Sequence, residues 1–184
     1  HTLVLASAIK GGVIALDARA SAVFTRAVIT NTSVGAAGDR VDGGVLFVDQ
    51  NALATLFDSV VDHTAAHAVS QARGGCFYSR GDLTLFNTRV AHCSMSVPFD
   101  CFGTFTWPTL RHSAETFRDG CDHTVMAVGG QQWRAQGGAF YVDSGNLVLT
   151  DGSSADSNAA LTGRTLFVQA GSALYVLPAP AGRW

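Results

Sequence analysis

Two aspartates four residues apart, Asp58 and Asp62, are the side chains in this sequence best placed for acid–base chemistry. Paired carboxylates at a defined separation are what glycoside hydrolysis needs. Arg26 and Arg89 stand at related positions of neighbouring repeats and could neutralise a uronate carboxylate, as a polysaccharide lyase requires. A solvated outer face would carry the same residue types. A carbohydrate-active enzyme that uses Asp58, Asp62 and Arg89 is therefore the alternative hypothesis rather than the first.

Three histidines, His63, His67 and His92, are of a type that binds metal ions. His63 and His92 align in successive repeats, and His67 follows shortly after the first. Two aligned ligands are too few for a protein zinc site without a third. Aligned polar turn residues explain the pair more simply, so we expect no metal site. The sequence contains no phosphate loop, dinucleotide fingerprint or serine elbow, and we expect no cofactor.

Three aromatic side chains, Trp107, Trp133 and Tyr141, are candidates for binding because they could stack on sugar rings. The two tryptophans lie in residues 96–136, which interrupt the repeat described below. This segment is interpreted as a degenerate coil or a loop insertion. Loops on a rigid scaffold often carry the binding residues, so we expect specific recognition here. The competing interpretation is that these aromatic residues anchor the loop to the core.

The four cysteines are Cys76, Cys93, Cys101 and Cys121. None forms a Cys-x-x-Cys motif, which argues against a zinc ribbon or a redox pair. An even number permits two disulfides and would place the chain in an oxidising compartment. Cys101 and Cys121 flank a loop with proline and tryptophan and are the favoured pair. Cys76 and Cys93 either form a second pair or remain as small buried thiols.

A short repeated pattern must position all of these residues. It consists of two glycines followed by four mostly apolar residues and then Asp or Arg, and it begins at Gly11, Gly43, Gly74 and Gly137. The starts lie 32, 31 and 63 residues apart, and 63 is close to two periods. A fixed period of this size indicates stacked supersecondary units.

Each unit is interpreted as a Gly-Gly corner followed by three short strands separated by polar breaks. This predicts an all-β protein, a right-handed single-stranded parallel β-helix of about five to six coils with roughly 31 residues each, forming one domain over residues 1–184. Alternation within the first strand points one set of residues inward. The intervening residues Phe47, Tyr78 and Tyr141 are expected to point outward or to pack under a neighbouring loop.

Composition excludes several classes of partner. The net charge is −2 and Lys10 is the only lysine, so a nucleic-acid surface is not expected. The sequence contains no apolar run of about 18 residues, so no membrane span is expected. The chain lacks an initial Met, and its Pro-rich end, residues 178–184, cannot continue a sheet. We therefore expect a fragment of a longer chain.

The Gly-Gly-apolar units, followed by strands that end in Phe57-Asp58 or Phe86-Asn87, resemble the glycine-rich repeats of polymorphic outer-membrane adhesins. They are also similar to the parallel β-helix repeats of large surface proteins in bacteria and protists. The likeness covers roughly residues 1–95 and 137–184. It implies a non-catalytic structural or adhesive module, extracellular or on the cell surface. The implied partners are other protein subunits, flanking parts of the same chain, or glycans.

Overall fold

The computed structural model of the chain is an all-β parallel β-helix, as the sequence predicts. It describes residues 2–4, 8–36, 40–68, 71–96, 127–128, 131–132, 134–150, 152–160, 163 and 165–177. These residues form strands, turns and bends and include no helix. Accordingly, no helix in the described part of the chain is long and apolar enough to cross a membrane.

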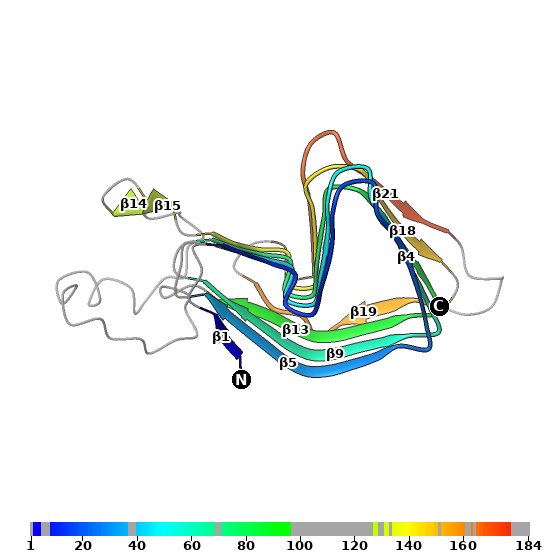
Figure 1. The fold of residues 1–184 in the computed structure, drawn as a ribbon, viewed down its shortest axis with the longest axis horizontal. Coiled ribbons are helices and arrows are strands. Elements are labelled where there is room, and N and C mark those ends of the chain that lie inside the picture. Colours follow the sequence, from blue (N-terminus) through cyan, green and yellow to red (C-terminus); the bar gives the residue numbers. More distant parts are fainter. Residues whose placement is uncertain are drawn as a thin grey trace.

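Four parallel sheets run the length of the stack (Figure 1). Sheet A contains β1 (Thr2–Val4), β5 (Val28–Ala36), β9 (Val60–His67), β13 (Arg89–Ser96) and β19 (Ser154–Asp156). Sheet B contains β2 (Ala8–Lys10), β6 (Arg40–Asp42), β10 (Gln71–Arg73) and β16 (Arg134–Gln136).

The other two parallel sheets have five strands each. Sheet C contains β3 (Ile14–Leu16), β7 (Leu46–Val48), β11 (Phe77–Ser79), β17 (Phe140–Val142) and β20 (Leu166–Val168). Sheet D contains β4 (Ser21–Thr25), β8 (Leu53–Phe57), β12 (Asp82–Phe86), β18 (Asn146–Thr150) and β21 (Ala173–Val176). A separate antiparallel hairpin joins β14 (Ala127–Val128) to β15 (Gln131–Gln132).

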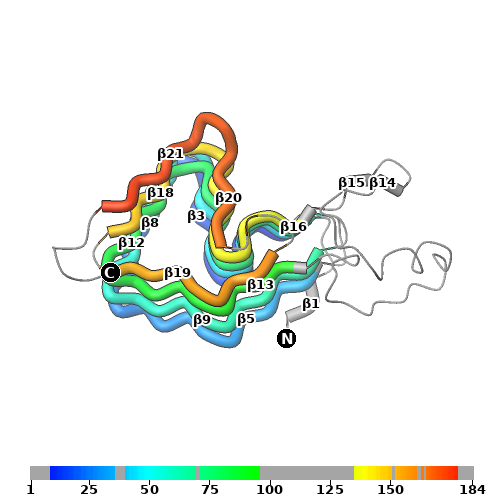
Figure 2. Tube along the Cα trace, turned by 180° about the vertical axis from the view of Figure 1, so that it is seen from behind, coloured from blue at the N-terminus to red at the C-terminus, as the bar shows by residue number. Residues whose placement is uncertain are grey.

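Each coil passes through the sheets in the order B, C, D and A, as the tube in Figure 2 shows. The first coil is β2 to β5, the second β6 to β9, the third β10 to β13 and the fourth β16 to β19, with β20 and β21 beginning a fifth. A coil thus has four strands, whereas the sequence predicted three. The strands of sheet B have three residues each and precede the glycine pairs.

The third coil pairs directly with the fourth, although 63 residues separate their glycine pairs. Phe77 is in register with Phe140, and Leu83 with Leu147. The third and fourth coils are therefore neighbours in the stack, and the described residues form about four to five coils, where the sequence predicted five to six.

The Gly-Gly pairs form the corner between sheets B and C. The first glycine of each pair has a positive φ, for example +74° at Gly43, which a residue with a Cβ adopts only at a cost. The second glycine lies against the next coil, and a Cβ on Gly44 would overlap the carbonyl oxygen of Gly75. Here the chain approaches sheet A, as Figure 1 shows.

This corner divides the interior into two apolar clusters. The larger lies within sheets C, D and A and includes Leu46, Phe77 and Phe140, all at most 2% exposed. The smaller lies between sheet B and the far half of sheet A and includes Val41, Ala66 and Ala72. Buried apolar side chains fill the interior on both sides of the corner, so close packing inside the solenoid holds the coils together.

Candidate functional site

The long strands of sheet A bend at one residue in each coil. The bend residues are Asn31, His63, His92 and Ser157, and their φ angles are 54°, 52°, 50° and 51°. This left-handed conformation is costly for most residues, although Asn, Asp and His adopt it several-fold more often than others. The repeated bend therefore explains why small polar residues and histidines recur at this column.

A residue with a left-handed backbone conformation changes which side chains of the strand lie next to one another. In a regular strand, adjacent residues point to opposite faces. At the second coil, Asp62 and His63 lie on the same outer face, and the Asp62 Oδ1 to His63 Nδ1 distance is 3.0 Å. The residue after the bend, Thr64, points inward and is 1% exposed. The outer face of the bend is thus crowded with polar side chains.

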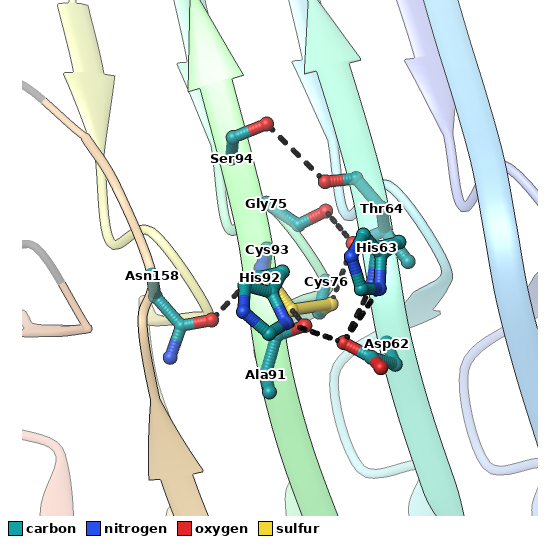
Figure 3. The surroundings of a disulfide bond; sticks show 10 residues. All are labelled: Asp62, His63, Thr64, Gly75, Cys76, Ala91, His92, Cys93, Ser94 and Asn158. Atoms are coloured by element: carbon teal, nitrogen blue, oxygen red, sulfur yellow. Dashed lines mark hydrogen bonds and ion pairs between the residues drawn. A yellow bond between two sulfur atoms is a disulfide. The ribbon is translucent and has the colours of Figure 1, made fainter.

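Asp62, His63 and His92 form one cluster across two coils (Figure 3). His92 Nδ1 lies 2.8 Å from the same Asp62 Oδ1, and the two imidazole rings stack with their centroids 4.4 Å apart. The backbone N–H of His63 also donates to Asp62 Oδ1 at 3.0 Å. Hydrogen bonds from His92 and His63 hold the pKa of Asp62 below its usual value, so this carboxylate is ionised at neutral pH.

A disulfide between Cys76 and Cys93 lies directly beneath this cluster on the inner side of sheet A (Figure 3). Cys93 follows His92, and Cys76 follows the glycine pair at the corner of the same coil. Thr64 Oγ1 approaches Cys76 Sγ at 2.7 Å, and Asn158 Oδ1 accepts from the backbone N–H of Cys93 at 2.9 Å. The bend is therefore covalently anchored to the opposite side of the coil.

The structure gives the predicted catalytic residues separate partners. Asp58 forms the turn between β8 and β9, with a φ of 48°, and accepts a hydrogen bond from Asn87 Nδ2 at 2.7 Å. Asp62 lies inside β9 and contacts the two histidines. Arg89 is exposed on β13, in register with Val60. The contacts do not bring the three together around one reacting group.

Tyr141 belongs to a column of rings on the outer side of sheet C. The rings of Phe47, Tyr78, Tyr141 and Phe167 stack at centroid distances of 5.0 to 5.3 Å. Tyr141 is 4% exposed and has another ring on each face. A sugar ring could stack on it only by displacing one of them. The column points away from the main core but is buried in the corner between sheets B and C.

Charged side chains of sheet B line the other side of this corner. Arg73 lies over Tyr78 and Tyr141, 4.6 and 5.1 Å from their centroids, and binds Asp42 through Nε at 2.8 Å and a second nitrogen at 3.1 Å. Arg40 also contacts Asp42 at 2.6 Å. Burial raises the pKa of Asp42 to about 6 even beside these guanidinium groups.

Sequence reasoning missed Asp62 as a partner of the histidines and named His67 instead. His67 lies four residues further along β9, about 13 Å of strand from the bend. Lys10, Asp42 and Arg73 are in register on sheet B, and this charged column was also missed. Trp107, Trp133, Cys101 and Cys121 lie outside the described residues.

Comparison with protein-family models, with curated proteins and with solved structures finds no match to this chain. The class of the protein is therefore defined by its fold alone, which is that of a parallel β-solenoid.

Proposed function

We propose that this chain is a non-catalytic structural or adhesive module of a surface or extracellular protein. The observation that carries the proposal is the Cys76–Cys93 disulfide, which clamps the corner of a coil to sheet A. Structural disulfides persist in oxidising environments such as the cell exterior. A stack locked in this way is suited to carrying load or presenting a fixed surface. The resemblance of its glycine repeats to those of adhesins points in the same direction.

The outer face of sheet D is the surface we propose for contact with a partner. Val23, Thr55, Thr84, Val148 and Tyr175 form one row across five strands. Val23 is 67% exposed and Tyr175 is 51% exposed, and Leu53 in the adjacent row is 46% exposed. Phe57 and Phe86 stack beside them at 4.7 Å. Apart from Thr55 and Thr84 these side chains are apolar, and exposed apolar side chains gathered on one face are typical of a binding surface.

The contacts of the acidic residues favour this proposal over an enzyme. A hydrolase needs one carboxyl group held protonated and a second held ionised around a substrate. Asp58 caps a turn and hydrogen-bonds Asn87, and hydrogen bonds lower the pKa of Asp62 instead of raising it. Neither residue has the environment of a general acid.

Binding of the purified chain to arrays of defined glycans and of purified extracellular proteins tests this proposal. We expect binding that is lost in Val23→Asp and Tyr175→Asp. Val28→Asp is the matched control, because Val28 is a valine of the same coil that is 71% exposed on sheet A. The proposed contact face is wrong if the sheet D variants bind as well as the wild type. Turnover of any polysaccharide by the wild type contradicts the proposed function itself.

A further inference from the structure

The geometry points to a divalent metal site at the bend of sheet A, formed by Asp62, His63 and His92, with Zn²⁺ as the ion that best matches the donor set. The cation would join the second coil to the third on the outside of the solenoid. This inference is independent of the proposed adhesive function.

The three ligand atoms converge on one point. His63 Nδ1 and His92 Nδ1 lie 3.0 and 2.8 Å from Asp62 Oδ1, and each of the three residues has a ligand atom within 4.8 Å of those of the other two. With bonds of about 2.0–2.1 Å, a tetrahedral zinc site separates its ligands by about 3.4 Å. Side-chain rotations that widen the two short contacts by a few tenths of an ångström would admit the ion. The His63 and His92 side chains are 59% and 42% exposed, so both imidazoles can make these rotations.

Both Nδ1 atoms face the same carboxylate oxygen, so the proton position on each imidazole decides how the cluster holds together. A neutral imidazole with its proton on Nδ1 donates to Asp62. In the other neutral tautomer the proton is on Nε2, and the Nδ1 lone pairs and the carboxylate oxygen repel one another unless a cation lies between them. Two neutral imidazoles and one carboxylate are a donor set typical of zinc, with the remaining position open to water. Binding the ion at Nδ1 thus moves each imidazole proton to Nε2 and needs no net loss of protons.

The surroundings hold the ligands in place before any metal binds. The backbone N–H of His63 fixes the Asp62 carboxylate. His63 and His92 have fixed left-handed backbone conformations, and the disulfide at Cys93 anchors the residue after His92 to the opposite wall of the coil. Metal sites bind more tightly when outer contacts orient the ligands in this way.

Neighbouring coils provide the substitutions for a test. Asn31 occupies the bend position in the first coil with the same left-handed backbone. His63→Asn and His92→Asn therefore remove one ligand each without removing the bend, and Asp62→Asn removes the charge. His67→Asn is the matched control, because His67 is an exposed histidine of the same strand that lies too far away to share the ion.

The experiment is calorimetric titration of the tag-free, chelator-treated chain with ZnCl₂, together with a melting curve of each variant without metal. We expect one strong site per chain, at least about tenfold weaker binding in His63→Asn, His92→Asn and Asp62→Asn, and unchanged binding in His67→Asn. Zn²⁺ should raise the Tm of the wild type but not of the three ligand variants. Equal binding in all folded variants, or no binding by the wild type, overturns the inference. So does a loss of binding in His67→Asn as large as in the ligand variants.

Discussion

Cys76 and Cys93 belong to the same coil, and their bond, with Cα atoms 5.6 Å apart, joins the glycine corner to the bend of sheet A. In the second coil the residue that follows the glycine pair is Val45, and the residue that follows the bend is Thr64. The third coil thus has a covalent bond at the positions that Val45 and Thr64 occupy in the second. Both cysteines belong to the larger apolar cluster, next to the corner that separates it from the smaller one.

Removing this disulfide should destabilise the chain. The bond closes a loop with a sequence separation of 17 residues, for which the chain-entropy model gives about 3 kcal/mol. We expect Cys76→Val/Cys93→Thr, which copies the second coil, to lose about that free energy of unfolding while keeping the fold. Urea unfolding of both proteins, with and without reductant, measures the difference. Wild-type stability that does not change on reduction would contradict this role.

The second glycine of each pair is expected to be indispensable. A Cβ at Gly44 would overlap the Gly75 carbonyl of the next coil, so Gly44→Ala forces two coils apart. The expected cost is at least about 2–3 kcal/mol, because a shifted backbone breaks several ladder hydrogen bonds. Gly35→Ala is the control, since a Cβ there meets nothing within 4 Å. Thermal melting of the two variants checks the contrast, and equal melting temperatures would refute it.

Asp42 should make stability depend on pH. Burial raises its pKa in the folded protein to about 6, above the value of about 3.9 for an exposed aspartate. The folded state therefore binds this proton more tightly than the unfolded chain does. The contribution of protonated Asp42 to the free energy of unfolding is present in full below about pH 4. It is lost as the pH rises through about 6.

Asp42→Asn cannot ionise and serves as the reference for that prediction. The free energy of unfolding of the wild type minus that of Asp42→Asn should fall as the pH is raised from about 4 to about 7. Chemical denaturation at several pH values gives this difference. The contributions of the other titrating groups to the free energy of unfolding are the same in both proteins and cancel. A difference that grows over the same range would show that the two arginines, rather than burial, control the carboxyl group.

Tyr78 should contribute through both its ring and its hydroxyl group. The ring is fully buried between Phe47 and Tyr141, and the hydroxyl donates to Asp143 Oδ2 at 2.7 Å. Tyr78→Phe restores the residue type of the previous coil and should cost only about 1 kcal/mol. Tyr78→Ala leaves a cavity in the column and should cost about 3–5 kcal/mol. Guanidinium denaturation measures both values, and a similar cost for the two variants would argue against the stacked column.

The parallel β-helix could be predicted because the coils repeat at nearly constant length, so that equivalent residues align without gaps. Sheet B escaped prediction because each of its strands points a single residue into the core. Val41 and Ala72 fill that position between polar or charged neighbours. The strands of sheet C are equally short, but they are mostly apolar and follow the glycine pair, whereas those of sheet B resemble a polar link.

The candidate site was predicted only in part. Alignment of the repeats placed His63 and His92 side by side, and the stacked rings confirm that contact. Asp62 was grouped with Asp58 instead, as two aspartates four residues apart. In a regular strand, adjacent residues such as Asp62 and His63 alternate between opposite faces. The left-handed backbone at His63 breaks that alternation, and a sequence pattern alone does not reveal such a residue.

We propose that this chain presents a surface for partners and does not cleave polysaccharides. The most direct measurement is product release from a panel of neutral and uronate-containing polysaccharides by the purified chain, beside Asp58→Asn/Asp62→Asn. We predict that neither protein releases product above a blank without protein. Product formed by the wild type and lost in the double variant would contradict the claim and identify the two aspartates as catalytic residues.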